Sequence, residues 1–144
     1  GEAVKVSVKR DRDDLTNDIK ARIREAENAG FRSAAVICKT LEDCSLMYSG
    51  LKDDIKGISL ITGKEDAYKG GLVVVPSYLA KGLEFDVVII ADAGSDIYGE
   101  NELDTKLLYV AMTRALHRLY IYYCGKPSPL IQGIADHSAQ GCDK

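Results

Sequence analysis

Hydrophobic and polar residues alternate with two different periods along the chain. Over residues 4–8 every second residue is apolar, which predicts a short strand with one exposed face. Four apolar residues within 15–26 then recur at helical spacing, and Gly30 stands where such a helix would end. A second amphipathic helix is predicted over 41–51, with Thr40 as its N-cap.

Several short runs are apolar without interruption. Residues 34–38, 72–75 and 87–91 are runs of this kind, which indicates strands buried on both faces. Residues 58–61 and 119–123 predict two further strands. Strands of this type in alternation with helices predict an α/β fold, in which a mostly parallel sheet carries helices on both faces. Ligands of such folds gather at the carboxyl ends of the strands.

The second half of the chain contains a predicted loop followed by a predicted helix. Residues 92–104 are acidic and contain glycine, which predicts a solvated loop. Residues 107–116 have the length and composition of a helix. We therefore expect one domain over residues 1–130, followed by a polar tail over 131–144.

Composition restricts the class of protein. The 144 residues, 46% hydrophobic and 28% charged, are typical of one soluble globular domain. No run approaches the roughly 18 apolar residues of a membrane span, and no apolar segment of a signal peptide begins the chain, so we expect a cytoplasmic protein without a membrane partner. The chain opens at Gly1 directly in a strand pattern, which indicates part of a longer protein. A net charge of −3 indicates that this domain does not bind nucleic acid without the help of another domain.

Several catalytic motifs are missing from the sequence. The nearest approach to a phosphate loop, residues 57–65, has its glycines six apart and Glu65 in place of the hydroxyl residue. The sequence contains neither the G-x-G of a dinucleotide-binding loop nor the G-x-S-x-G of a hydrolase. The four cysteines form no C-x-x-C pair, so no metal site is expected. Asp92 follows an apolar strand as Mg²⁺-binding aspartates do, but we assign it no such role without a phosphate loop. The chain alone is therefore not expected to hydrolyse ATP.

Arg114 is the most informative single residue. It is the only formally charged side chain within 107–116, and no carboxylate lies within helical reach of it. A guanidinium among apolar neighbours requires an anion from elsewhere in the fold or from a ligand. The alternatives are a distant aspartate, a head group that reaches water, or a phosphate whose charge Arg114 stabilises during phosphoryl transfer.

Two longer segments carry a resemblance to a known family. AKGLEF (80–85) and LYVAMTRA (108–115) resemble motifs V and VI of superfamily 1 helicases of the UvrD/Rep/PcrA type, and AAVICKT (34–40) resembles motif IV. Within this family, the resemblance is closest to the HelD branch, whose members act on transcribing RNA polymerase. It rests on the segments PSYLAKGLEFDVVII and LLYVAMTRALHRLYI. The resemblance implies RecA-like domain 2A, which lacks its own phosphate loop and closes over ATP and Mg²⁺ held by domain 1A.

The resemblance also implies roles for individual residues. Arg114 is expected to contact the γ-phosphate, and Lys39 stands where the family has a second arginine on the same phosphate. Lys81 and Gly82 are expected near the phosphates, and Glu84 at the ribose.

The resemblance also implies residues that contact single-stranded DNA, and the sequence differs from the family pattern in several respects. Ser77 and Tyr78 stand where the family contacts single-stranded DNA, although the usual Thr-x-His is replaced. Cys38 stands where the family stacks a tyrosine on adenine, and only residues 40–80 separate Lys39 from Lys81, too few for the family's large 2B insertion. We expect the second motor domain of an ATP-dependent helicase or translocase, HelD-like and acting on RNA polymerase or nucleic acid. The alternatives are a conventional UvrD-type DNA helicase and a non-catalytic α/β interaction module.

Overall fold

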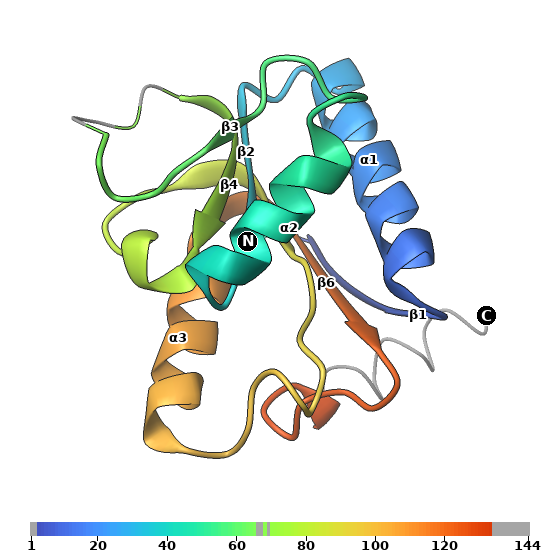
Figure 1. Ribbon diagram of the computed structural model, residues 1–144, viewed down its shortest axis with the longest axis vertical. Helices are drawn as coiled ribbons and strands as arrows, with labels where there is room; N and C mark the ends of the chain where they lie inside the picture. The colour runs from blue at the N-terminus through green and yellow to red at the C-terminus, as the bar shows by residue number, and fades with distance from the viewer. Residues whose placement is uncertain (1–2, 66–67, 69, 134–144) are drawn as a thin grey trace.

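Six parallel strands form one sheet at the centre of the domain (Figure 1). The computed structural model describes residues 3–65, 68 and 70–133. Along the sheet the order is β1-β6-β5-β2-β4-β3, and each pair of neighbours runs parallel. The bounds are β1 Ala3–Lys9, β2 Ser33–Cys38, β3 Ser59–Leu60, β4 Gly71–Pro76, β5 Phe85–Ile90 and β6 Ala115–Cys124.

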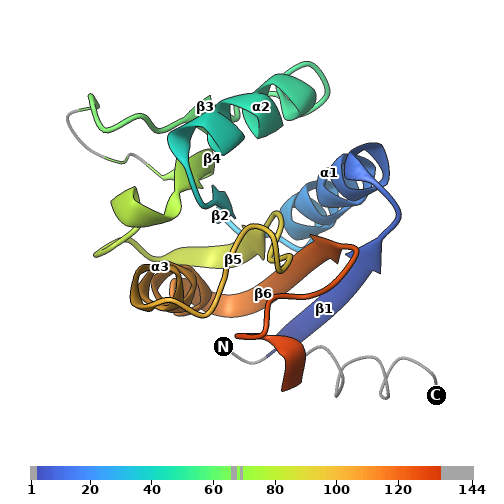
Figure 2. The same cartoon turned by 60° about the horizontal axis from the view of Figure 1, so that its bottom comes forward.

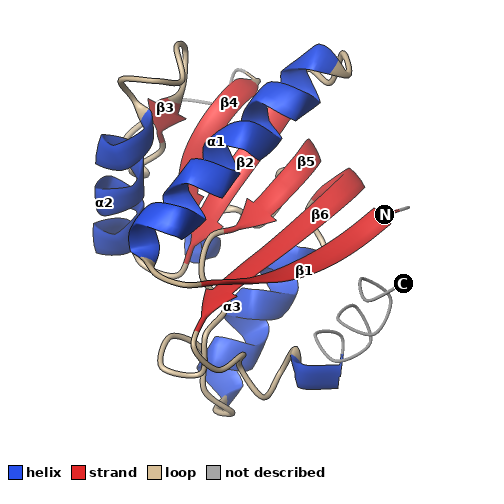
Figure 3. Cartoon of the chain, turned by 90° about the vertical axis from the view of Figure 1, so that its right-hand side faces the viewer, coloured by secondary structure: helices blue, strands red, loops and turns tan. Residues whose placement is uncertain are grey.

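Helices cover both faces of this sheet, as Figures 2 and 3 show. On one face, α1 (Arg12–Asn28) and α2 (Leu41–Leu51) pack their apolar residues against β2, β4, β5 and β6. The opposite face carries α3 (Glu102–Met112) and the short 3₁₀ helix η1 (Ser77–Leu79). Ile131 is buried in this second core, so the first residue of the predicted tail packs with the domain. The predicted α/β fold with a parallel sheet and two covered faces is confirmed.

The end of α1 and the start of α2 lie where the sequence predicts. Thr40 caps α2 by accepting the N–H of Asp43 at 3.0 Å. Gly30 follows α1 with a φ of 86°, a conformation that favours glycine, and the N–H of Phe31 returns to the carbonyl of Ala26.

The predicted helix over 107–116 is wrong at both ends. The helix begins at Glu102 because the side chain of Asn101 accepts the N–H of Asp104 at 2.8 Å and caps it. It ends at Met112, and the residues from Ala115 onward belong to β6. A single apolar run therefore spans the end of a helix and the start of a strand, which periodicity alone does not separate.

The prediction of a solvated loop over 92–104 is also wrong. Ala93 and Tyr98 are fully buried within it. The N–H of Ala93 donates to the carbonyl of Tyr122, and its own carbonyl accepts the N–H of Ser128. The segment is thus held between the end of β6 and the C-terminal turn, and it forms part of the core. The predicted strand over 58–61 is shorter in the structure, at two residues.

Candidate functional site

Residues 77–84 connect the carboxyl end of β4 to the amino end of β5. They begin with η1 and continue into a turn in which the N–H of Leu83 donates to the carbonyl of Ala80 at 3.0 Å. Gly82 has a φ of 84°, a conformation that residues with side chains rarely adopt. The turn therefore requires glycine at this position and brings residues 81–84 to the amino edge of the sheet.

Arg114 lies in the turn between α3 and β6. Its Nε donates to the carbonyl of Val110 at 3.0 Å, one terminal nitrogen donates to the carbonyl of Leu83 at 3.4 Å, and the other to the hydroxyl of Thr113 at 3.2 Å. It forms no ion pair with any residue in 3–65, 68 or 70–133. Of the alternatives raised by the sequence, a distant aspartate is thus excluded among the described residues. Neutral oxygens hold the guanidinium, and the partly exposed side chain has no ionic partner among the described residues.

The predicted residues Lys81, Gly82 and Glu84 lie at the same edge of the sheet as Arg114. Phe85 pairs with Ala115 between β5 and β6, so Glu84 and Arg114, each one residue earlier, lie side by side. Lys81 and Glu84 are exposed, and within the described part of the chain neither side chain makes a hydrogen bond or an ion pair. This edge of the sheet thus carries two cations, Arg114 and Lys81, and one carboxylate, Glu84.

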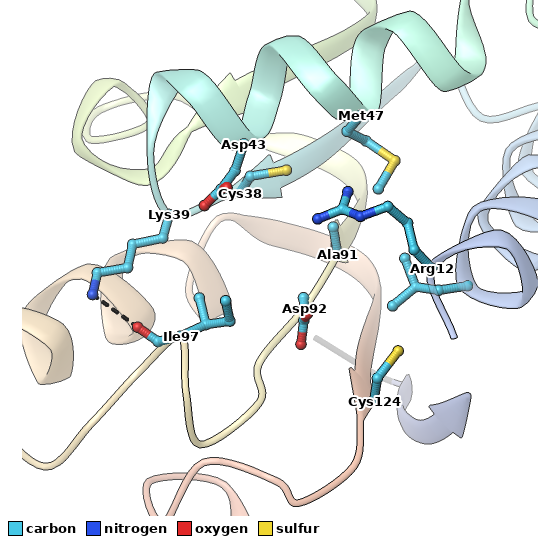
Figure 4. A pocket seen from close by; sticks show the side chains of 10 residues that line it. Arg12, Cys38, Lys39, Asp43, Met47, Ala91, Asp92, Ile97 and Cys124 are labelled. Carbon is cyan, nitrogen blue, oxygen red and sulfur yellow. Dashed lines mark hydrogen bonds between the residues drawn. The ribbon is translucent and has the colours of Figure 1, made fainter. Parts of the chain in front are cut away.

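Lys39 lies at the opposite edge of the sheet, beyond the carboxyl end of β2. Its Nζ contacts Oδ1 of Asp104 at 2.7 Å. It also donates to the carbonyl of Ile97 at 2.8 Å, the bond drawn in Figure 4. By strand register, Lys39 is displaced along the strands from Arg114 by eight residues, or about 25 Å at roughly 3.3 Å per residue. The structure therefore does not bring Lys39 and Arg114 together, and the two cannot contact one phosphate within this domain.

Asp104 is the partner of Lys39 that the sequence analysis missed. It is 5% exposed, and its carboxylate also accepts the N–H of Gly99 at 2.8 Å and the side-chain amide of Asn101 at 3.1 Å. The hydrogen bond from Lys39 is the largest cause that lowers the pKa of Asp104 below its ordinary value. The spacing Asn101-x-x-Asp104 resembles a capping box and is the signal that could have placed a helix start here.

The two residues predicted to contact nucleic acid lie in different surroundings. Ser77 is fully buried, and its hydroxyl donates a hydrogen bond to the backbone carbonyl of Leu107 in α3. Tyr78 is 53% exposed. Of the two side chains, only that of Tyr78 is exposed at the surface.

A small cavity lies at the carboxyl edge, between the starts of α1 and α2 (Figure 4). Its volume of about 50 Å³ suits ordered water and is far too small for a nucleotide. Burial raises the pKa of the Asp92 carboxyl, which lies in this cavity beside Arg12 and Cys124. The described residues contain no group of three or more His, Cys, Asp or Glu side chains that could hold a metal ion.

Comparison with known proteins assigns the chain to a family. A family model described as the UvrD-like helicase C-terminal domain matches residues 71–122, from β4 into β6. The crystal structure of the C-terminal domain of a possible DNA helicase from Lactobacillus plantarum WCFS1 is 31% identical, with a TM-score of 0.79. The alignment covers 92% of this chain and 80% of that one.

More distant structures share the fold alone. The C-terminal domain of the DEAD-box protein Dbp5 is 13% identical with a TM-score of 0.62, over 94% of this chain and 86% of that one. Domain 2 of the DEAD-box helicase Mss116p, bound to an RNA duplex, is 17% identical with a TM-score of 0.52, over 86% and 55%. No curated protein sequence matches significantly. Among the described helices none has the length and apolar character needed to cross a bilayer. By its matched segment and its 31% identical relative, the chain belongs to the family of UvrD-like helicase C-terminal domains.

Proposed function

We propose that this chain is the second motor domain of an ATP-dependent helicase or translocase. It completes an ATP site whose phosphate loop and Mg²⁺ are supplied by a partner domain 1A of the same protein. The observation that carries this proposal is the guanidinium of Arg114, which has no ionic partner among the described residues and is held by the backbone carbonyls of Val110 and Leu83, next to Glu84 in the strand register. A positioned cation that awaits an anion is the arrangement that phosphoryl transfer requires.

Each residue at the amino edge has a distinct task in this proposal. Arg114 stabilises the negative charge that develops on the γ-phosphate. The carboxylate of Glu84 accepts hydrogen bonds from the ribose hydroxyls, and Lys81 adds positive charge near the phosphates. Lys39 stays outside this set because its charge is already paired with Asp104 at the other edge of the sheet.

Single-stranded DNA is the polymer that we propose for this motor. Tyr78 is exposed at the carboxyl end of β4 and can stack on a base, which is a sequence-tolerant contact. The net charge of −3 means that the other domains supply most of the phosphate contacts.

Two enzyme classes fit this proposal. Only residues 40–80 separate Lys39 from Lys81, too few for a large 2B insertion, which favours a HelD-like remodeller that acts on RNA polymerase. A conventional UvrD-type DNA helicase is the second candidate, and it is favoured by the 31% identical relative, which is described as a possible DNA helicase. In a non-catalytic interaction module, the third alternative, only solvent would balance the charge of Arg114.

The separately purified domain is expected to show no ATP turnover. It has no phosphate loop to hold the β- and γ-phosphates, so that Arg114 has no bound substrate to act on. Release of inorganic phosphate from ATP, followed with and without oligo-dT, measures this directly. Multiple turnovers by the domain alone would show that it is not half of a composite site.

The same domain is expected to bind single-stranded DNA poorly at physiological salt. Its acidic balance repels the phosphates, and a single exposed tyrosine supplies little stacking. Fluorescence anisotropy with labelled oligo-dT measures the Kd. A Kd below about 1 μM, tighter than typical non-specific binding, would contradict the proposed division of contacts between the domains.

A further inference from the structure

A buried serine joins the segment 77–84 to helix α3. Ser77 is fully buried, and its hydroxyl donates to the backbone carbonyl of Leu107. Leu107 lies in the middle of α3, so this bond holds the helix itself. A buried hydroxyl without a partner costs free energy, and the bond therefore favours one placement of α3 relative to the end of β4.

The same segment contacts the far end of this helix. The carbonyl of Leu83 accepts a hydrogen bond from the Arg114 guanidinium, and the N–H of Phe85 donates to the Arg114 carbonyl at 3.0 Å. The Nε–H of Arg114 also donates to the carbonyl of Val110 in the last turn of α3. Residues 77–85 thus hold α3 and the following turn at two places, about 10 Å apart at 1.5 Å per residue.

We propose that Ser77 is a positioning residue, which acts through the Leu107 carbonyl and α3 to set the place of Arg114 according to what binds at Tyr78. The inference rests on the proposed function, because it assigns the regulation of the same site. Tyr78 directly follows Ser77 in η1 and is exposed. Because Ser77 and Tyr78 are consecutive in η1, a nucleic-acid strand that stacks on Tyr78 acts on the segment that the Ser77 bond joins to α3 and, through α3, to Arg114.

The test is Ser77→Ala in the complete protein, with ATP turnover measured with and without oligo-dT. Without the bond, a nucleic-acid strand at Tyr78 no longer places Arg114, so the oligo-dT-stimulated kcat should fall between about tenfold and a hundredfold, towards the turnover without oligo-dT. The KM for ATP should change by less than about twofold, because domain 1A still binds the phosphates. The ratio of turnover with oligo-dT to turnover without it should approach one. Turnover is expressed per folded molecule, below the unfolding temperature of every variant.

Ser128→Ala is the matched control. Ser128 is also fully buried, and its Oγ accepts the N–H of Leu130 at 3.1 Å, outside both α3 and residues 77–84. This variant should keep its kcat and its stimulation. If Ser77→Ala keeps them equally well, the positioning role is overturned while the ATPase function stands. If the unaltered complete protein shows no ATP turnover with oligo-dT, the proposed function fails, and the positioning role fails with it.

Discussion

Arg114→Ala in the complete protein is expected to lower kcat for ATP by about a thousandfold or more, as loss of an arginine that stabilises the transferring phosphoryl group typically does. Arg114→Lys should lose nearly as much, because a point charge cannot reproduce the planar fork of the guanidinium. Steady-state ATP turnover at saturating oligo-dT gives kcat. The unfolding temperature should fall only modestly, because the substitution removes two hydrogen bonds to backbone carbonyls and no ion pair among the described residues.

Arg118→Ala is a suitable control on the neighbouring strand. Its guanidinium packs 4.9 Å from the centre of the Phe31 ring, and no catalytic role is assigned to it. The control should keep kcat near the unaltered value. A structural role for Arg114 predicts the reverse pattern for Arg114→Ala, with a lower unfolding temperature and an unchanged kcat per folded molecule. That pattern would remove Arg114 from the site.

Asp104→Asn is expected to reduce the free energy of unfolding by about 3 kcal/mol at neutral pH, because it leaves a partly buried Lys39 without its counter-charge. For a domain of this size the unfolding temperature should fall by roughly 10 °C. The pKa of Asp104 is lowered in the folded state, so its stabilising effect is present above the unfolded value of about 3.9. This effect is lost as the pH falls through the lower, folded value.

The stability difference between the unaltered domain and Asp104→Asn should therefore shrink as the pH is lowered below about 4. Urea unfolding of both proteins over a pH series measures this. Glu102→Ala is the control, because Glu102 pairs with Lys106 at the surface of the same helix and should cost less than about 1 kcal/mol. An Asp104→Asn domain as stable as the control would show that the ion pair does not anchor α3.

Local signals were sufficient to predict most of the sheet and two helices. The uninterrupted apolar runs that became β2, β4 and β5 are typical of buried strands, and Thr40 and Gly30 mark helix ends through bonds made within a few residues. Tertiary contacts decided the features that the sequence did not predict. Residues 92–104 look solvated from composition, yet contacts with β6 and the C-terminal turn bury them.

The same distinction applies to the candidate site. Arg114 stood out because its charge had no partner within reach along the chain, and the structure shows no ion pair for it among the described residues. Lys39 and Ser77 also looked like ligand-binding residues, but their partners, Asp104 and the Leu107 carbonyl, are distant in sequence. Only the packing of α3 reveals that both side chains are already engaged within the domain.

The most direct test of the central claim is a structure of the complete protein with ADP and aluminium fluoride, which imitates the transferring phosphoryl group. The account predicts that the Arg114 guanidinium leaves its carbonyl partners on Val110 and Leu83 and lies within hydrogen-bonding distance, about 3 Å, of the fluoride. Glu84 should then contact the ribose. If Arg114 keeps both carbonyl contacts while the fluoride is bound without it, this domain does not complete the ATP site.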